Sequence, residues 1–197
     1  MDKNITTNIV EDDDDDDVSP ASRPPKLVAD SVLINLTHVD FLTSNLVEAG
    51  HDNPKLELVY RASIDGDVNF HTICDGIPNT LMVIKAKDTG QIFGGYTRNP
   101  WSYNGAYSND TKAFLFSLSK LKKIPIENAG WATYNVKQTY FIVWGYPDDI
   151  KLYEGFMTNN KNTSVLNAYK SNDITDKNYL TDCNNFYVEE LELFKIL

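Results

Sequence analysis

The residues best suited to chemistry are a histidine and a cysteine, His71 and Cys74, which lie three positions apart. On one helical turn their side chains can meet, and a neighbouring imidazole can activate a cysteine as a nucleophile or a redox centre. The same spacing is common by chance, and a part-buried cysteine beside a surface histidine explains it more simply. A thiol-based antioxidant acting through Cys74 or through the second cysteine, Cys183, is therefore an alternative hypothesis.

The other acidic motifs do not assemble a catalytic or metal site. Asp65-Gly66-Asp67 is similar to the start of a calcium loop, but it lacks the remaining ligands and the glutamate at the twelfth position. Asp148-Asp149 follows Pro147 and has no partner acid or base nearby, so it is interpreted as a solvated turn. We therefore expect no catalytic residue, no metal and no cofactor.

The chain is acidic, and its charge is unevenly distributed. The 197 residues carry a formal net charge of −10, and more than half of it lies in residues 1–25, where Asp12 to Asp17 form an unbroken run. Without a clustered basic face, binding to nucleic acid or to an anionic membrane surface is disfavoured. No apolar run is long enough to span a bilayer, and the N-terminus has no secretory signal. We expect a location in the cytoplasm or the nucleus.

Composition divides the chain into two parts. Residues 1–26 are predicted to be a disordered acidic leader, because the aspartates repel one another and the prolines that follow stop any helix. Residues 27–197 are predicted to form one domain, since a chain with 42% hydrophobic and 12% aromatic residues can build a core. The leader is interpreted as a solvated spacer, and an adaptor that recruits a basic partner is the alternative.

The hydrophobic pattern of the domain predicts a mainly β (α+β) fold. A short helix is expected over 37–49, capped by Thr37 and ended by Gly50. Strands are expected after it over 56–61, 80–86, 91–97, 113–118, 139–144, 150–154 and 186–196. The second and third of these strands are expected to form a hairpin. Residues 158–177 are rich in Asn, Ser and Asp and are predicted to be a long surface loop. The pattern indicates a two-sheet β-sandwich flanked by a few short helices.

Two adjacent glycines, Gly94 and Gly95, lie inside one predicted strand. No Lys-Ser or Lys-Thr pair follows them, so they are not a phosphate-binding loop. Paired glycines in a strand allow a second backbone or a large ring to approach closely. Trp101 is expected to cover them.

The order of several short motifs after the leader resembles the TLDc domain. These are YRAS and DG within 60–66, FH and CD within 70–75, FGGYT at 93–97, Trp101-Ser102 and AFLFSL at 113–118. Each motif is weak alone, but the ordered set is specific and covers about residues 30–197. We expect its positions to be mostly structural: Tyr60, Arg61, Asp65, Gly66, His71, Cys74, Asp75, Phe93, Gly94, Gly95, Tyr96, Trp101, Phe114 and Phe116.

This resemblance implies a β-sandwich without established enzymatic activity. Members of the family are linked to protection against oxidative stress, and several bind the vacuolar proton-pumping ATPase and control its assembly. The implied partner is a protein, with subunits of that pump as candidates, and the implied location extends to the cytosolic face of acidic organelles. We expect a monomer that is not inserted in the membrane.

Two charged motif positions and one irregular segment are predicted to affect the surface of the domain. Arg61 and Asp65 are predicted to brace a turn by hydrogen bonds, and they are also the candidate interaction residues. Residues 144–150, WGYPDDI, contain one glycine where the family usually has several. We therefore expect the shape of this one surface to depart from the family pattern.

Overall fold

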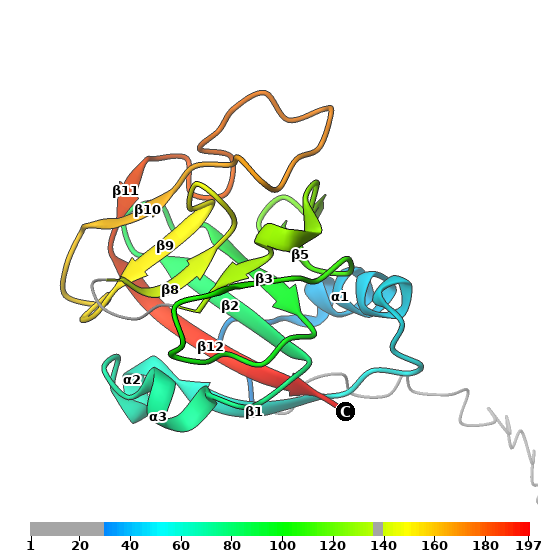
Figure 1. The fold of residues 1–197 in the computed structure, drawn as a ribbon, viewed down its shortest axis with the longest axis horizontal. Coiled ribbons are helices and arrows are strands. Elements are labelled where there is room, and N and C mark those ends of the chain that lie inside the picture. The colour runs from blue at the N-terminus through cyan, green and yellow to red at the C-terminus, as the bar shows by residue number, and fades with distance from the viewer. Residues whose placement is uncertain (1–29, 136–139) are drawn as a thin grey trace, which may run out of the picture.

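The computed structural model describes residues 30–135 and 140–197 (Figure 1). The predicted acidic leader, residues 1–26, lies outside the described residues. Within them the chain forms two antiparallel sheets with a few short helices, which confirms the predicted fold class. None of the helices in this part of the chain is long and apolar enough to cross a membrane.

The first sheet contains the strands with the longest apolar runs. Its strands, in spatial order, are β1 (Leu56–Arg61), β12 (Val188–Ile196), β2 (Thr80–Ala86), β3 (Ile92–Thr97), β5 (Phe114–Ser117) and β6 (Lys122–Pro125). The predicted hairpin is β2 and β3, which pair from Thr80 with Thr97 to Lys85 with Ile92. β2 and β12 lie inside this sheet and are buried almost throughout, because both faces of the sheet are covered.

The second sheet is built from shorter strands. In spatial order they are β11 (Asn185–Phe186), β10 (Asn162–Ser164), β9 (Ile150–Tyr153), β8 (Tyr140–Trp144), β7 (Thr133–Tyr134) and β4 (Tyr107–Ser108). The strand predicted over 186–196 is in fact divided, since β11 belongs to this sheet and β12 to the first. The chain therefore crosses from one sheet to the other at Tyr187.

The packing has three layers. One apolar cluster joins alternate residues of the first sheet, such as Met82 and Ile84, to Ile142, Trp144 and other residues of the second. A second cluster joins the opposite face of the first sheet to helix α1 (Leu36–Ala49). Three further short helices, α2 (Ala62–Asp65), α3 (Phe70–Cys74) and η1 (Ala129–Trp131), lie in the connections. The order is thus second sheet, first sheet and α1.

Helix α1 begins at a different cap from the predicted one. Asn35, not Thr37, is the N-cap: its Oδ1 accepts from the His38 N–H at 3.2 Å, and the Asn35 N–H donates to His38 Nδ1 at 3.3 Å. Asparagine is at least as good a cap as threonine, and here it lets the helix start at Leu36. Gly50 ends the helix with a φ of 109°, as predicted.

The glycine pair permits a close approach, although not to the ring that the sequence indicated. A Cβ on Gly94 would lie 1.9 Å from the carbonyl oxygen of Met82, and one on Gly95 would lie 2.8 Å from the ring of Trp144. The covering ring is therefore Trp144 of the second sheet. Trp101 packs edge-on against Trp144 and donates its indole N–H to Thr80.

Two polar segments predicted to be solvated are built into the fold. Residues 158–177 include β10 and the buried Asn162 and Tyr169. Asp149, predicted in a solvated turn, is fully buried and accepts backbone N–H groups of Asn167, Ala168 and Tyr169 at 2.6, 2.9 and 3.0 Å. Its carboxylate anchors the segment 167–169, since three otherwise unpaired donors converge on it.

Candidate interaction surface

Residues 60–75, which contain the YRAS, DG, FH and CD motifs, form a corner of β1, α2 and α3 that we call the motif corner (Figure 1). The Tyr60 hydroxyl donates to the carbonyl of Gly66 at 3.0 Å. Asp65 Oδ2 accepts from the backbone N–H of Arg61 at 2.8 Å. Both bonds close the chain around α2, so these motif residues brace the turn.

The Arg61 side chain is used inside the fold. Its guanidinium lies 2.7 Å from Glu192 Oε1 on β12, and it also donates to the carbonyl of Asp30. The Glu192 side chain is fully buried, and it accepts further hydrogen bonds from the Ser31 hydroxyl at 2.6 Å and the Val32 N–H at 3.0 Å. Arg61 therefore ties the first described residues to the sheet, and little of it is open to a partner. Asp65 is half-buried.

The His71 side chain joins the motif corner to the second sheet. Its Nδ1 lies 2.8 Å from Asp75 Oδ1, and its Nε2 lies 2.7 Å from the carbonyl of Phe141 on β8. The rings of Phe70, Tyr103 and Phe141 surround it at centroid distances of 5.4, 5.3 and 4.8 Å. Both ring nitrogens of His71 therefore contact groups other than the Cys74 thiol.

The two cysteines are free, and neither environment favours a thiolate. Cys74 is fully buried, and this burial raises the pKa of its thiol, with the negative charges of Asp75 and Asp65 raising it further. Burial also raises the pKa of Cys183, followed by the charge of Asp88. Reactive thiols need a lowered pKa and exposure, so the geometry disfavours the thiol hypothesis. Among residues 30–135 and 140–197, no group of three or more His, Cys, Asp or Glu is placed to hold a metal ion.

A different surface presents exposed aromatic rings. Tyr107 on β4, Trp131 on η1 and Tyr146 in the turn between β8 and β9 are 38, 39 and 48% exposed. The ring of Tyr146 lies 5.2 Å from Trp131 and 5.6 Å from Tyr107, and Tyr107 lies 4.7 Å from Tyr134 on β7. These four residues form one contiguous surface, which we call the aromatic patch.

The backbone fixes the aromatic patch at one edge of the second sheet. Tyr107 and Tyr134 are directly paired in the β4–β7 ladder, which places their side chains on the same face. Tyr146 is held beside them by the β8–β9 turn, where Gly145 approaches the buried Asp149 so closely that a Cβ would lie 1.8 Å from its Oδ2. The patch is therefore supported from below by a buried polar anchor.

An ion pair lies beside the aromatic patch. Asp148, next to Tyr146, pairs with Lys151 at 2.7 Å. Burial raises the pKa of Tyr107 to about 12, and the charge of Asp148 is the next cause, followed by Tyr146 and Tyr134. The hydroxyl of Tyr107 is therefore protonated at neutral pH.

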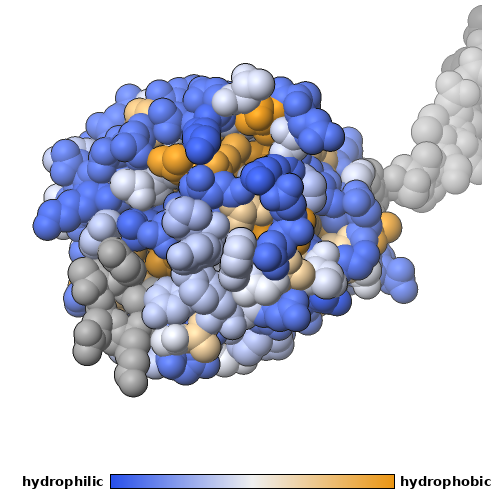
Figure 2. Space-filling view, turned by 45° about the horizontal axis from the view of Figure 1, so that its top comes forward, coloured by the Kyte–Doolittle hydropathy of each residue, from blue (hydrophilic) through white to orange (hydrophobic). Residues whose placement is uncertain are grey.

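A second surface feature is a small hollow beside the segment that Asp149 anchors. A cavity of about 220 Å³ is lined by residues 166–177, with Leu166, Tyr169 and Ile174 as its apolar part. Figure 2 shows hydrophobic residues in a hollow between hydrophilic segments on this side of the molecule. The lining carries charges of both signs, Lys170 and Asp176 among them, so it does not favour one class of ligand.

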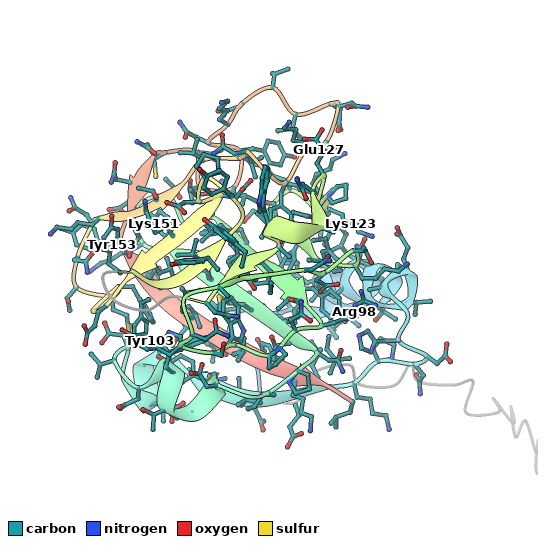
Figure 3. The ribbon with its side chains drawn as sticks, viewed as in Figure 1. Arg98, Tyr103, Lys123, Glu127, Lys151 and Tyr153 are labelled. Carbon is teal, nitrogen blue, oxygen red and sulfur yellow. The ribbon has the colours of Figure 1, made fainter. Side chains whose placement is uncertain are left out.

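The aromatic patch was missed by sequence reasoning, which named Arg61 and Asp65 as candidate interaction residues. In Figure 3 the labels of Tyr103, whose ring contacts His71 of the motif corner, and of Glu127, which precedes η1, lie apart in the view. The one available signal was the irregular segment 144–150, which contains Tyr146 and was expected to alter a surface.

A family model described as TLDc domain matches residues 27–197, which include all the described residues. A search of the curated proteins finds no match.

Proposed function

The chain belongs to the TLDc domain family, and on this premise we propose that it binds the vacuolar proton-pumping ATPase and influences its assembly. The family suggests a protein-interaction module related to oxidative stress, and its domains are generally regarded as non-enzymatic. In this proposal the protein acts as a monomer at the cytosolic face of acidic organelles. Residues 27–197 are the interaction domain, and residues 1–26 are its acidic leader.

The observation that carries the proposal is the aromatic patch. Tyrosine and tryptophan are enriched at protein interfaces and among the few residues that carry most of the binding energy there, because they offer a large apolar area with one polar group. In the patch three such side chains are between 38 and 48% exposed, and they touch one another through their rings. A surface of this kind is better explained by a protein partner than by the needs of the fold.

The motif corner supports the assignment of binding to the aromatic patch, because its own side chains are used within the fold. The side chain of Arg61 is only 13% exposed and is paired with Glu192. His71 and Cys74 face internal partners or the core. These residues stabilise the shape on which the patch depends, and the proposal assigns binding to the patch.

The test is a binding measurement between the full chain and the purified catalytic sector of the pump. We expect association at micromolar protein. The double variant Trp131→Ala/Tyr146→Ala should bind on the order of thirtyfold more weakly, as expected for loss of interfacial hot spots. Ile64→Ala is the matched control, since Ile64 is an exposed apolar residue of the motif corner. No association of the wild type, or equal association of the double variant, would contradict the proposal.

A further inference from the structure

We propose that the aromatic patch binds the cationic group of an arginine or lysine side chain that a basic segment of the partner protein presents. This inference rests on the proposed function, because it specifies the chemistry of the partner at the same surface. It assigns the patch a ligand class that apolar contact alone would not select.

The first support is the ring geometry. Trp131, Tyr146, Tyr107 and Tyr134 follow one another at centroid distances of 5.2, 5.6 and 4.7 Å. The exposed face of an indole or phenol ring carries the negative part of the ring quadrupole, and it attracts a cation within about 6 Å of the centroid. In the proposal, neighbouring rings of the patch contact one guanidinium or ammonium group together.

The second support is the charge around the rings. After burial, the negative charge of Asp148 is the next cause of the raised pKa of Tyr107, so this carboxylate acts on that ring. The exposed neighbours Asn109 and Asn128 are polar and uncharged. Lys151, a described cation near Asp148, lies 2.7 Å from that carboxylate and 5.9 Å from the ring centroid of Tyr153, which is outside the patch. The carboxylate of Asp148 therefore favours a cationic ligand over an anionic one at these rings.

The third support is the charge of the whole chain. The net charge of −10 attracts basic partners over a long range, and the run Asp12 to Asp17 holds a large part of it. This attraction is not specific for a site. The rings then decide where a basic side chain docks, so the two effects are separable by experiment.

The experiment uses the full chain and two peptides of about a dozen residues that differ only in having arginine or citrulline at alternate positions between glycines. Citrulline keeps the length and planar shape of arginine but is neutral, because a carbonyl group replaces one amino group of the guanidinium. The readout is the indole N–H signal of Trp131 in the NMR spectrum, with the buried Trp101 and Trp144 as internal references. We expect a saturable shift at Trp131, with citrulline binding about twofold to fivefold more weakly. A lysine peptide serves as the second cation.

Three variants separate the ring effect from the general attraction. Tyr146→Leu keeps apolar area but removes a ring, so it should weaken the arginine peptide about twofold to fivefold and leave the citrulline peptide unchanged. Replacing Asp12 to Asp17 by asparagine should weaken arginine binding and leave the Trp131 shift at saturation intact. Ile64→Ala should change neither affinity.

The outcomes distinguish this inference from the proposed function. Equal affinity for arginine and citrulline, or a shift that spares Trp131, overturns the inference, and so does preferential binding of a glutamate peptide at the patch. If the patch variant loses the pump while arginine and citrulline bind alike, the proposed function stands without this inference. If arginine is preferred at Trp131 but the pump does not bind, the proposed function fails alone.

Discussion

The motif corner and the aromatic patch use their side chains in opposite ways. In the motif corner Tyr60, Arg61 and His71 direct their polar groups to partners inside the domain, at distances between 2.7 and 3.0 Å. In the aromatic patch Trp131 and Tyr146 leave 39 and 48% of their surface to solvent. The polar groups of the motif corner stabilise the fold, whereas the aromatic patch exposes large apolar rings that a partner can contact.

This difference separates the residues that identify the family from those that present a binding surface. The four residues of the aromatic patch are not among the motif positions that carry the resemblance. Buried ion pairs and bracing hydrogen bonds tolerate few replacements, because removing one partner leaves the other unsatisfied. A docking surface carries no such internal constraint, so two proteins of one fold can differ there.

The strongest test of the comparison is Arg61→Ala in the motif corner. The substitution leaves the fully buried carboxylate of Glu192 without its cation. We expect the free energy of unfolding to fall by about 3–5 kcal/mol, the usual cost of breaking a buried pair. Urea unfolding followed by circular dichroism measures it, with Ile64→Ala as a control that changes less than about 0.5 kcal/mol. An unchanged midpoint of urea unfolding together with lost partner binding would assign Arg61 to the interaction surface, and the contrast between the two regions would then be wrong.

A second test concerns the buried anchor beneath the aromatic patch. Burial raises the pKa of Asp149 to about 6, although hydrogen bonds from backbone N–H groups oppose the shift. In the unfolded chain this pKa is about 3.9, so the folded state binds the proton more tightly. The stability that results is fully present below about pH 4 and is lost as the pH rises through about 6.

The measurement is the difference in free energy of unfolding between wild type and Asp149→Asn from pH 4 to pH 7. We expect the wild type to lose up to about 3 kcal/mol relative to the variant across that range. Other titrating groups cancel in the difference. If the difference stays flat, the three donors keep the carboxylate ionised throughout, and the anchor is an ordinary hydrogen-bonded aspartate.

A smaller effect is expected for Tyr60→Phe, which removes one hydroxyl from the motif corner and keeps the ring. The lost hydrogen bond to the Gly66 carbonyl should cost about 1 kcal/mol of unfolding free energy. Thermal unfolding is the measurement, and the ring contact with Phe70 at 5.5 Å should persist. A loss several times larger would show that the motif corner folds as a unit around this bond.

The elements that were predicted correctly from the sequence are those whose hydrophobic pattern or end signal lies within a short stretch of the chain. β2, β3 and the second part of the 186–196 run are long enough for apolar residues to stand out, and Gly50 ends α1 as expected. Strands of two residues, such as β4 and β7, are too short to show alternation. Asp149 was misjudged because its partners lie at 167–169, and a backbone N–H leaves no trace in a sequence pattern.

The aromatic patch escaped prediction for a related reason. Its rings come from separate segments that only the β4–β7 pairing and two turns bring together. An isolated aromatic residue has the same appearance in sequence whether it is buried or exposed. Trp144 is fully buried and Tyr146, two positions later, is 48% exposed. Only the turn geometry around Gly145 distinguishes them.

The last test measures stability in the aromatic patch itself. Because Trp131 and Tyr146 are 39 and 48% exposed, replacing both by alanine removes little buried area. We expect Trp131→Ala/Tyr146→Ala to lower the free energy of unfolding by less than about 1 kcal/mol, while weakening partner binding on the order of thirtyfold. Urea unfolding and the pump-binding assay, run on the same preparation, give both numbers. A large loss of stability would mean that these rings support the fold, and the contrast with the motif corner would disappear.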